Sequence, residues 1–136
     1  MHIEVLEENI NVKALIVEAN SIKMFLGAGW RDIDQVGLQA PKALADPNDW
    51  WDKSIGRLSK VQLPENYFKY CMFDTPLINR YIEKYGLMRT RLMNTHPKSV
   101  YSMHWDMTKR IHIPLITNPD CLMIIKHIIL NQAMYI

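Results

Sequence analysis

The chain has 136 residues, with 16 Lys and Arg against 14 Asp and Glu and a formal net charge of +2. This near balance excludes the strongly basic surface that nucleic acids or anionic membranes attract, and no apolar run approaches the roughly 20 residues of a membrane span. The N-terminus lacks a signal-peptide pattern and Cys71 and Cys121 lie far apart, so we expect one cytoplasmic domain with reduced thiols.

The first predicted element is a helix that begins after Asn11, a suitable N-cap residue. Apolar residues recur behind it with a 3.6-residue period, at Val12, Leu15, Ile16, Ala19, Ile22 and Phe25. Gly27-Ala-Gly29 should end this helix. The following stretch, residues 30–64, is irregular, with strand-sized pieces near Gln35–Gln39 and Gly56–Gln62.

A second helix is predicted over residues 76–85. Thr75 can serve as its N-cap and Pro76 suits the first helical position. One apolar face follows, formed by Leu77, Ile78, Tyr81, Ile82 and Tyr85. Gly86 is a typical residue at the end of a helix.

Strand patterns dominate the rest of the chain. They cover Met88–Asn94, Val100–Met103, Arg110–Thr117 and Leu122–Leu130, with turn residues between them. Helices followed by strands indicate an α+β protein that is mainly β. We therefore expect residues 1–136 to form a single domain, with a helical and loop part over 1–86 and a β part over 87–136.

A histidine and a carboxylate lie two residues apart in Tyr101-Ser-Met-His-Trp-Asp106. In an extended chain, residues i and i+2 point to the same side, so His104 and Asp106 can bind one metal ion from a single strand. Non-haem Fe(II) oxygenases use two histidines and one carboxylate on one face of the iron. The alternative is a surface turn in which Asp106 caps the bend that follows it.

The next predicted strand carries Arg110, His112 and Pro114 on one face and Ile111, Ile113 and Leu115 on the other. The isoleucine face is expected to pack in the core. A guanidinium and an imidazole on the opposite face would suit an anionic small molecule held beside a metal. The alternative is that Arg110 pairs with Asp106 while His112 is solvated.

Two further arginines, Arg89 and Arg91, share one face of the strand expected over Met88–Asn94. A solvated basic face is the preferred interpretation, and contact with a carboxylate in the mouth of a barrel is the alternative. His127 lies within an apolar run, which favours a strand histidine over a metal ligand.

The segment from Met88 to Pro119 resembles the aspartyl/asparaginyl β-hydroxylase family. This is a branch of the Fe(II)- and 2-oxoglutarate-dependent oxygenases that also includes hydroxylases of free amino acids. The specific pattern is His104-x-Asp106 followed by Arg-x-His-x-Pro-Leu-x-Thr-Asn at residues 110–118. The resemblance is close over residues 86–125 and looser before them.

The resemblance implies a double-stranded β-helix, or jelly roll, with N-terminal helices and an iron site between its two sheets. His104 and Asp106 would be Fe(II) ligands. Arg110 would hold the carboxylates of the cosubstrate 2-oxoglutarate, and His112 would line the same pocket. The implied reaction hydroxylates an amino acid or an Asp/Asn-type residue of a peptide, and no nucleic acid or membrane takes part.

The family pattern also includes a distal histidine as third ligand and an arginine after it. The chain ends at Ile136 before such a segment, and His127 lies too early to match it. We therefore expect a C-terminally truncated member with an incomplete barrel, whose open sheet edges would favour self-association. Three functions stay open: an oxygenase, a non-catalytic half-barrel that acts as a binding or assembly remnant, and a cupin-like metal or small-ligand binder.

Overall fold

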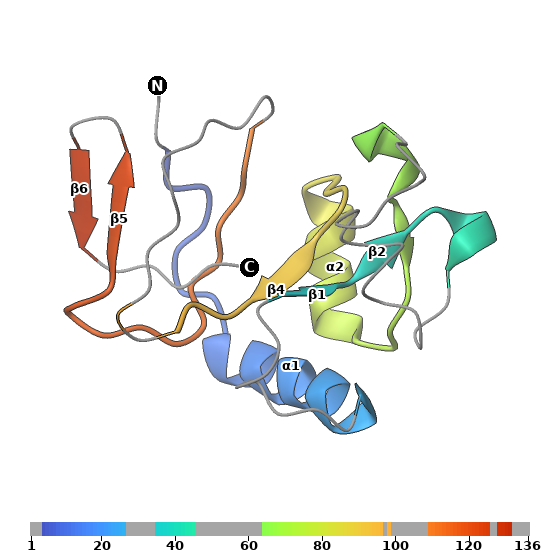
Figure 1. Ribbon diagram of the computed structural model, residues 1–136, viewed down its shortest axis with the longest axis horizontal. Helices are drawn as coiled ribbons and strands as arrows, with labels where there is room; N and C mark the ends of the chain where they lie inside the picture. Colours follow the sequence, from blue (N-terminus) through green and yellow to red (C-terminus); the bar gives the residue numbers. More distant parts are fainter. Residues whose placement is uncertain are drawn as a thin grey trace.

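The computed structural model describes residues 4–26, 35–45, 64–96, 98, 109–125 and 128–131. This part of the chain is an α+β structure (Figure 1). In chain order its elements are α1 (Val12–Leu26), β1 (Gln35–Gly37), β2 (Gln39–Ala40), the 3-10 helices η1 (Lys42–Leu44) and η3 (Glu65–Tyr67), β3 (Tyr70–Cys71), α2 (Pro76–Lys84), β4 (Arg91–Met93), β5 (Leu122–Ile125) and β6 (Ile128–Asn131).

Helix α1 forms where the sequence predicts it. The side chain of Asn11 accepts a hydrogen bond from the backbone N–H of Ala14 at 3.1 Å, which confirms the N-cap. Leu15, Ala19 and Ile22 are buried. These positions are four and three residues apart, so they lie on one face of the helix, and this face packs into the core.

Helix α2 is also confirmed, but its cap differs from the prediction. Thr75 holds the N-cap position without a capping bond from its side chain. The backbone N–H groups of Leu77 and Ile78 instead donate to the two carboxylate oxygens of Glu18 on α1, each at 2.8 Å. A carboxylate at this place satisfies helix N–H groups and complements the positive end of the helix dipole. Gly86, with φ of +58°, follows the end of the helix.

The described strands form three two-stranded antiparallel sheets, and these do not close into a barrel. In the first, β1 pairs with β4 so that Val36 lies opposite Leu92. In the second, β2 pairs with β3. Leu38 connects the two, because its N–H donates to the carbonyl of Thr90 at 2.8 Å and its carbonyl accepts from the N–H of Met72 at 3.0 Å.

A buried amide holds the same segments together. Gln39 is only 1% exposed. Its Nε2 donates to the carbonyls of Lys69 at 3.1 Å and Leu87 at 3.0 Å, and its Oε1 accepts from the N–H of Thr90 at 3.0 Å. The Gln39 side chain therefore joins its own strand to residue 69 and to residues 87–90, and its polar atoms are satisfied.

The core lies between the two helices and the β1–β4 sheet. Its buried members are Leu15, Ala19, Ile22, Val36, Leu38, Ile78, Tyr81, Ile82, Leu92 and Ile113. Ile113 brings the segment after residue 109 onto this core, with Ile111 and Leu115 packed beside it. The hairpin of β5 and β6 lies at the opposite end of the molecule from β2 (Figure 1).

Three strand predictions need correction. Residues 110–117 contain no strand; Pro114 lacks a backbone N–H and a bend follows it. The predicted strand Leu122–Leu130 is two strands, since Leu122 pairs with Asn131 and Ile125 pairs with Ile128. In the sequence, the polar pair Lys126-His127 divides this apolar run in two.

The third correction concerns Met88–Asn94, where only Arg91–Met93 is strand. The predicted strands Val100–Met103 and Gly56–Gln62 lie outside the described residues. Among the helices that the structure describes, none has the length and apolarity needed to cross a bilayer.

Candidate functional site

The two residues expected to bind iron, His104 and Asp106, lie outside the described part of the chain, as does His127. Within the described ranges, no group of three or more His, Cys, Asp and Glu side chains is placed to hold a metal ion. The residues expected to bind the cosubstrate, Arg110 and His112, are described. These two residues define the candidate site.

Arg110 and His112 lie on the exposed face of the segment 109–115. Arg110, His112 and Pro114 are exposed, whereas Ile113 is buried and Ile111 and Leu115 are half-buried. The predicted alternation of core and surface is thus confirmed, although the segment is not a strand. Because Ile113 is buried in the core, the side of the segment that carries Arg110 faces outward.

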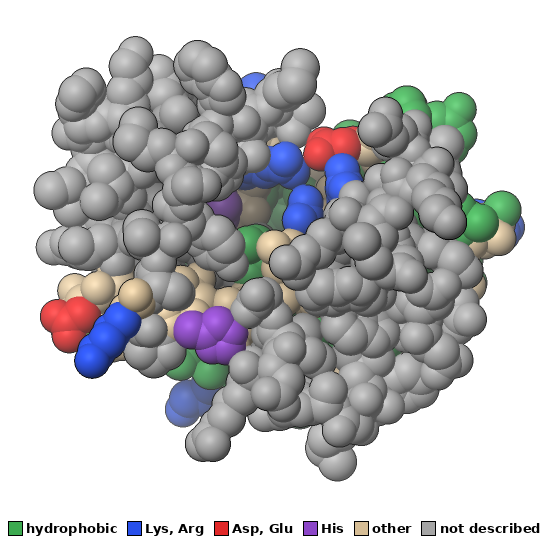
Figure 2. Space-filling view, viewed as in Figure 1, with side chains coloured by type: hydrophobic (Ala, Val, Ile, Leu, Met, Phe, Trp, Pro, Cys, Tyr) green, Lys and Arg blue, Asp and Glu red, His purple; other side chains and the backbone are tan. Residues whose placement is uncertain are grey.

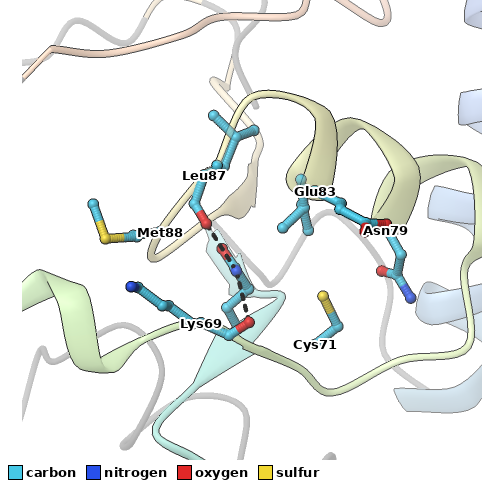
Figure 3. Close-up of a pocket in the computed structure, with 9 residues that line it drawn as sticks. Lys69, Cys71, Asn79, Glu83, Leu87 and Met88 are labelled. Carbon is cyan, nitrogen blue, oxygen red and sulfur yellow. Dashed lines mark hydrogen bonds between the residues drawn. The ribbon is translucent and has the colours of Figure 1, made fainter.

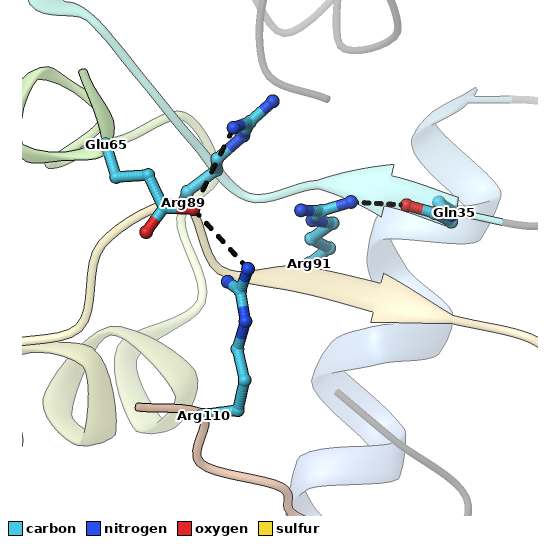
Figure 4. Close-up of polar contacts among 5 residues, drawn as sticks. All are labelled: Gln35, Glu65, Arg89, Arg91 and Arg110. Atoms are coloured by element: carbon cyan, nitrogen blue, oxygen red, sulfur yellow. Dashed lines mark hydrogen bonds and ion pairs between the residues drawn. The ribbon is translucent and has the colours of Figure 1, made fainter. Parts of the chain in front are cut away.

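The guanidinium of Arg110 meets a carboxylate that sequence analysis did not single out (Figure 4). Arg110 Nη2 lies 3.5 Å from Oε1 of Glu65, which is at the start of η3. Arg89 Nη1 lies 3.9 Å from the same oxygen. One carboxylate oxygen is therefore shared by two arginines from different parts of the chain. The contact proposed between Arg110 and Asp106 involves a residue outside the described part.

Arg89 is placed by its backbone and by an aromatic ring. Its φ of +56° lies in the left-handed region, which is unusual for a residue with a side chain. Its N–H donates to the carbonyl of Phe68 at 2.9 Å, and its guanidinium carbon lies 5.1 Å from the centre of the Phe68 ring. This distance is within the range of a cation–π contact. The preferred prediction of a solvated strand arginine is wrong here, because the Arg89 side chain is 21% exposed and precedes β4.

Arg91 is the first residue of β4, next to the buried Leu92. Because neighbouring strand residues point to opposite faces, Arg91 points away from the core. Its Nη1 donates to Oε1 of Gln35 at 2.7 Å (Figure 4). Gln35 belongs to β1, so this hydrogen bond links the two paired strands on their outer face. Arg91 is therefore half-buried and held, which also differs from a solvated position.

The surface around Glu65 is rich in cationic side chains. On the face shown in Figure 2, Lys and Arg side chains gather near an acidic one in a hollow of the surface. Arg89 and Arg110 contact Glu65 itself, whereas Arg91 bonds to Gln35. Guanidinium groups hold carboxylates with directional hydrogen bonds. The arrangement is thus able to bind a carboxylate, and Glu65 is the carboxylate that it holds here.

Glu65 was missed because nothing near it in sequence indicates its partners. It follows Pro64, precedes Asn66-Tyr67-Phe68 and lies 45 residues before Arg110. The pairing depends on the tertiary packing of η3 against the segment before β4.

A pocket of about 500 Å³ has Gln39 in its wall (Figure 3). Its lining residues include Lys69, Cys71, Asn79 and Glu83. Burial raises the pKa of the Cys71 thiol. A thiol with a raised pKa is a weak nucleophile at neutral pH, so the Cys71 environment does not favour covalent chemistry. The Gln39 amide in the same wall is already used in structural hydrogen bonds.

No family model matches this chain, and searches of curated proteins and of solved structures also give no match.

Proposed function

We propose that the chain belongs functionally to the Fe(II)- and 2-oxoglutarate-dependent oxygenases. Its substrate would be an amino acid or an Asp/Asn-type residue in a peptide, which it would hydroxylate. The fold proposed with this function is a jelly roll, of which the described antiparallel strands would be a part. Sequence supplies the main support, through His104-x-Asp106 and Arg110-x-His112.

One structural observation carries the proposal further. Arg110, the residue proposed to hold 2-oxoglutarate, contacts the Glu65 carboxylate at 3.5 Å. A carboxylate is also the group that Arg110 would bind in 2-oxoglutarate, so this contact supports the proposed role of the arginine. Ile113, three residues later, anchors the segment in the core and keeps the arginine at the surface.

The donor set proposed for iron is His104 and Asp106. An imidazole and a carboxylate are suitable ligands for Fe(II), which when bound would supply the activation of oxygen. The roles of the other residues follow from their chemistry. Arg110 would bind and orient a cosubstrate carboxylate through charge-assisted hydrogen bonds, and His112 would lie on the same face.

The test is an anaerobic titration of the chain with Fe(II), with and without 2-oxoglutarate, that follows the visible absorption band of the metal–cosubstrate complex. We expect a saturable band that depends on 2-oxoglutarate. His104→Ala should abolish it. Arg110→Ala should weaken 2-oxoglutarate more than Fe(II), whereas the neighbouring Lys109→Ala, which removes the same charge from an exposed position, should not.

A second candidate is a carboxylate-binding module without catalysis. It is favoured by the same Arg110–Glu65 contact, which does not require a metal. Under this alternative the titration gives no band, while binding of a dicarboxylate to the metal-free chain persists. An unchanged Fe(II) affinity in His104→Ala would also exclude the oxygenase site as drawn and leave this candidate.

A further inference from the structure

The pocket beside Gln39 combines an apolar interior with two opposite charges. Its volume of about 500 Å³ is typical of sites for small ligands. The buried Ile82 and the half-buried Cys71 line its inner part. Lys69 and Glu83 also line it and are exposed, so they place one charge of each sign at its rim.

Hydrogen bonds hold the walls of this pocket in place. Gln39, which is 1% exposed, donates to the carbonyls of Lys69 and Leu87 and thereby ties two of the lining segments together. Asn79 donates to the carbonyl of Phe73 at 3.0 Å. A ligand would therefore meet backbone positions that are already fixed, which lowers the ordering cost of binding.

Helix α2 carries one side of the pocket from its interior to its rim. Asn79, Ile82 and Glu83 are three and four residues apart, so they lie on one face of the helix. Glu83 belongs to the last turn, where the helix dipole does not stabilise a carboxylate. Its charge is thus not needed for the stability of α2.

The two rim charges lie at opposite ends of the pocket. In Figure 3 the Lys69 side chain extends to one side, whereas Glu83 lies on the other. Among the contacts of the described residues, no ion pair or side-chain hydrogen bond engages the Lys69 ammonium or the Glu83 carboxylate. Both groups are consequently available to a ligand.

From this arrangement we propose that the pocket binds a small linear zwitterion, with a carboxylate and an ammonium group at opposite ends of an apolar chain. Lys69 would bind the carboxylate and Glu83 the ammonium group, while the methylenes of the ligand cover Ile82 and Cys71. The charge separation selects ω-amino acids over α-amino acids, whose two charges share one carbon atom. Neither Arg110 nor His112 lines this pocket, so the proposal goes beyond the oxygenase function.

The test is an NMR titration of the metal-free chain with ω-amino acids of increasing length, from 4-aminobutanoate through 6-aminohexanoate to 8-aminooctanoate. Each is compared with the α-amino acid of the same formula, which for 6-aminohexanoate is norleucine. The two isomers have equal net charge and composition, and they differ in the separation of their charges. At the best length we expect the ω-isomer to bind about twofold to fivefold more tightly, because it reaches both rim charges.

Charge-neutral variants assign each end of the ligand. Lys69→Gln and Glu83→Gln should each weaken the best ω-amino acid by about twofold to fivefold. Lys13→Gln and Glu8→Gln remove the same charges from exposed positions elsewhere and are the matched controls. Hexanoate, which has no ammonium group, should be weakened by Lys69→Gln but not by Glu83→Gln.

The Cys71 thiol gives an independent measure of occupancy. It lines the pocket, so a bound ligand should slow its alkylation by iodoacetamide. Cys121 is half-buried as well and is not among the lining residues, which makes it the internal control in the same chain. Mass spectrometry of the two cysteine peptides compares their rates of alkylation.

Equal affinities of the two isomers at every length would overturn the proposal. Losses in Lys69→Gln and Glu83→Gln no larger than in their controls, or equal protection of Cys71 and Cys121, would do the same. None of these measurements uses iron or 2-oxoglutarate, so their outcome does not depend on the iron titration.

Discussion

Ile78 near the start of α2 and Glu18 in the middle of α1 are joined by a hydrogen bond of 2.8 Å from the backbone N–H to the carboxylate. The N–H of Leu77 makes an equivalent bond to the other oxygen of the same group. One side chain therefore satisfies two N–H groups at the beginning of α2 and links this helix to α1. Glu18 thus caps α2, a role that the sequence predicts for Thr75.

Replacement of Glu18 by Ala should lower the free energy of unfolding by about 2 kcal/mol, because two helix N–H groups lose a charged acceptor. Glu18→Gln should lose less, since its amide oxygen still accepts one bond. Urea unfolding at neutral pH measures both. Glu8→Ala, which removes a carboxylate from an exposed position, is the control, and a loss in Glu18→Ala no larger than in this control would contradict the capping role.

The cap of α1 was predictable from the sequence, whereas the cap of α2 was not. Asn11 caps α1 through a bond to a residue three positions later, so the signal and its partner fall within one short window. Helix α1 was predicted in part for this reason, and helix α2 was predicted from Pro76, its apolar face and Gly86. The partners of Glu18 lie 59 and 60 residues away, and no local pattern connects them.

The buried amide of Gln39 provides a second prediction. Gln39→Met keeps much of the volume and removes three hydrogen bonds, which leaves two carbonyls and one N–H without this partner. We expect a loss of about 2–4 kcal/mol in the free energy of unfolding. Chemical denaturation checks the value, and a loss below about 1 kcal/mol would mean that water replaces the amide.

Docking of the segment 109–115 can be tested with two isoleucines. Ile113 is 9% exposed and belongs to the core, whereas Ile116 is 59% exposed. Ile113→Ala should cost about 2–4 kcal/mol through lost burial and a residual cavity. Ile116→Ala should stay within about 0.5 kcal/mol. Similar costs in the two variants, measured by thermal unfolding, would show that the segment is not anchored by Ile113.

A pH dependence should arise where the N-terminal segment meets α2. Lys84 Nζ and Tyr85 Oη both donate to Oε2 of Glu7, each at 2.6 Å. The hydrogen bond from Lys84, followed by that from Tyr85, lowers the pKa of Glu7. The hydrogen bond to Glu7 in turn raises the pKa of Lys84 and of Tyr85.

The sign of the effect follows from these directions. A carboxyl group with a lowered pKa stabilises the fold above its unfolded pKa, and this stabilisation is lost as the pH falls through the folded pKa. The raised pKa values of Lys84 and Tyr85 add stability that is lost as the pH rises through them. The unfolding midpoint of the unchanged chain should therefore exceed that of Glu7→Gln at neutral pH and approach it in acid and in strong alkali. A constant difference across this range would contradict the assignment.

The left-handed backbone of Arg89 gives a prediction that separates strain from charge. Arg89→Ala and Arg89→Gly both remove the guanidinium, but only glycine adopts a φ of +56° without a steric cost. The Gly variant should be about 1 kcal/mol more stable than the Ala variant. Denaturant unfolding of the two compares them directly; equal stabilities would indicate that the backbone relaxes when the side chain is removed.

The candidate site was predictable only in part. The alternation of Ile111, His112 and Ile113 indicates which side of the segment faces outward, and this holds although Pro114 prevents a strand. The pairing of Arg110 with Glu65 depends on a fold in which residues 45 positions apart become neighbours. The proposed ligands His104 and Asp106 stay a prediction from their spacing.

The partners of residues 35–40 have a consequence for synthesis of the chain. The bonds made by Gln35, Leu38 and Gln39 reach Lys69, Met72, Leu87, Thr90 and Arg91, all of which are translated later. While the ribosome adds these residues, α1 and the strand segment behind it lack the surfaces that cover Leu15 and Val36. The nascent chain thus carries exposed apolar groups until β4 has emerged, and it is in this interval that it would depend most on molecular chaperones.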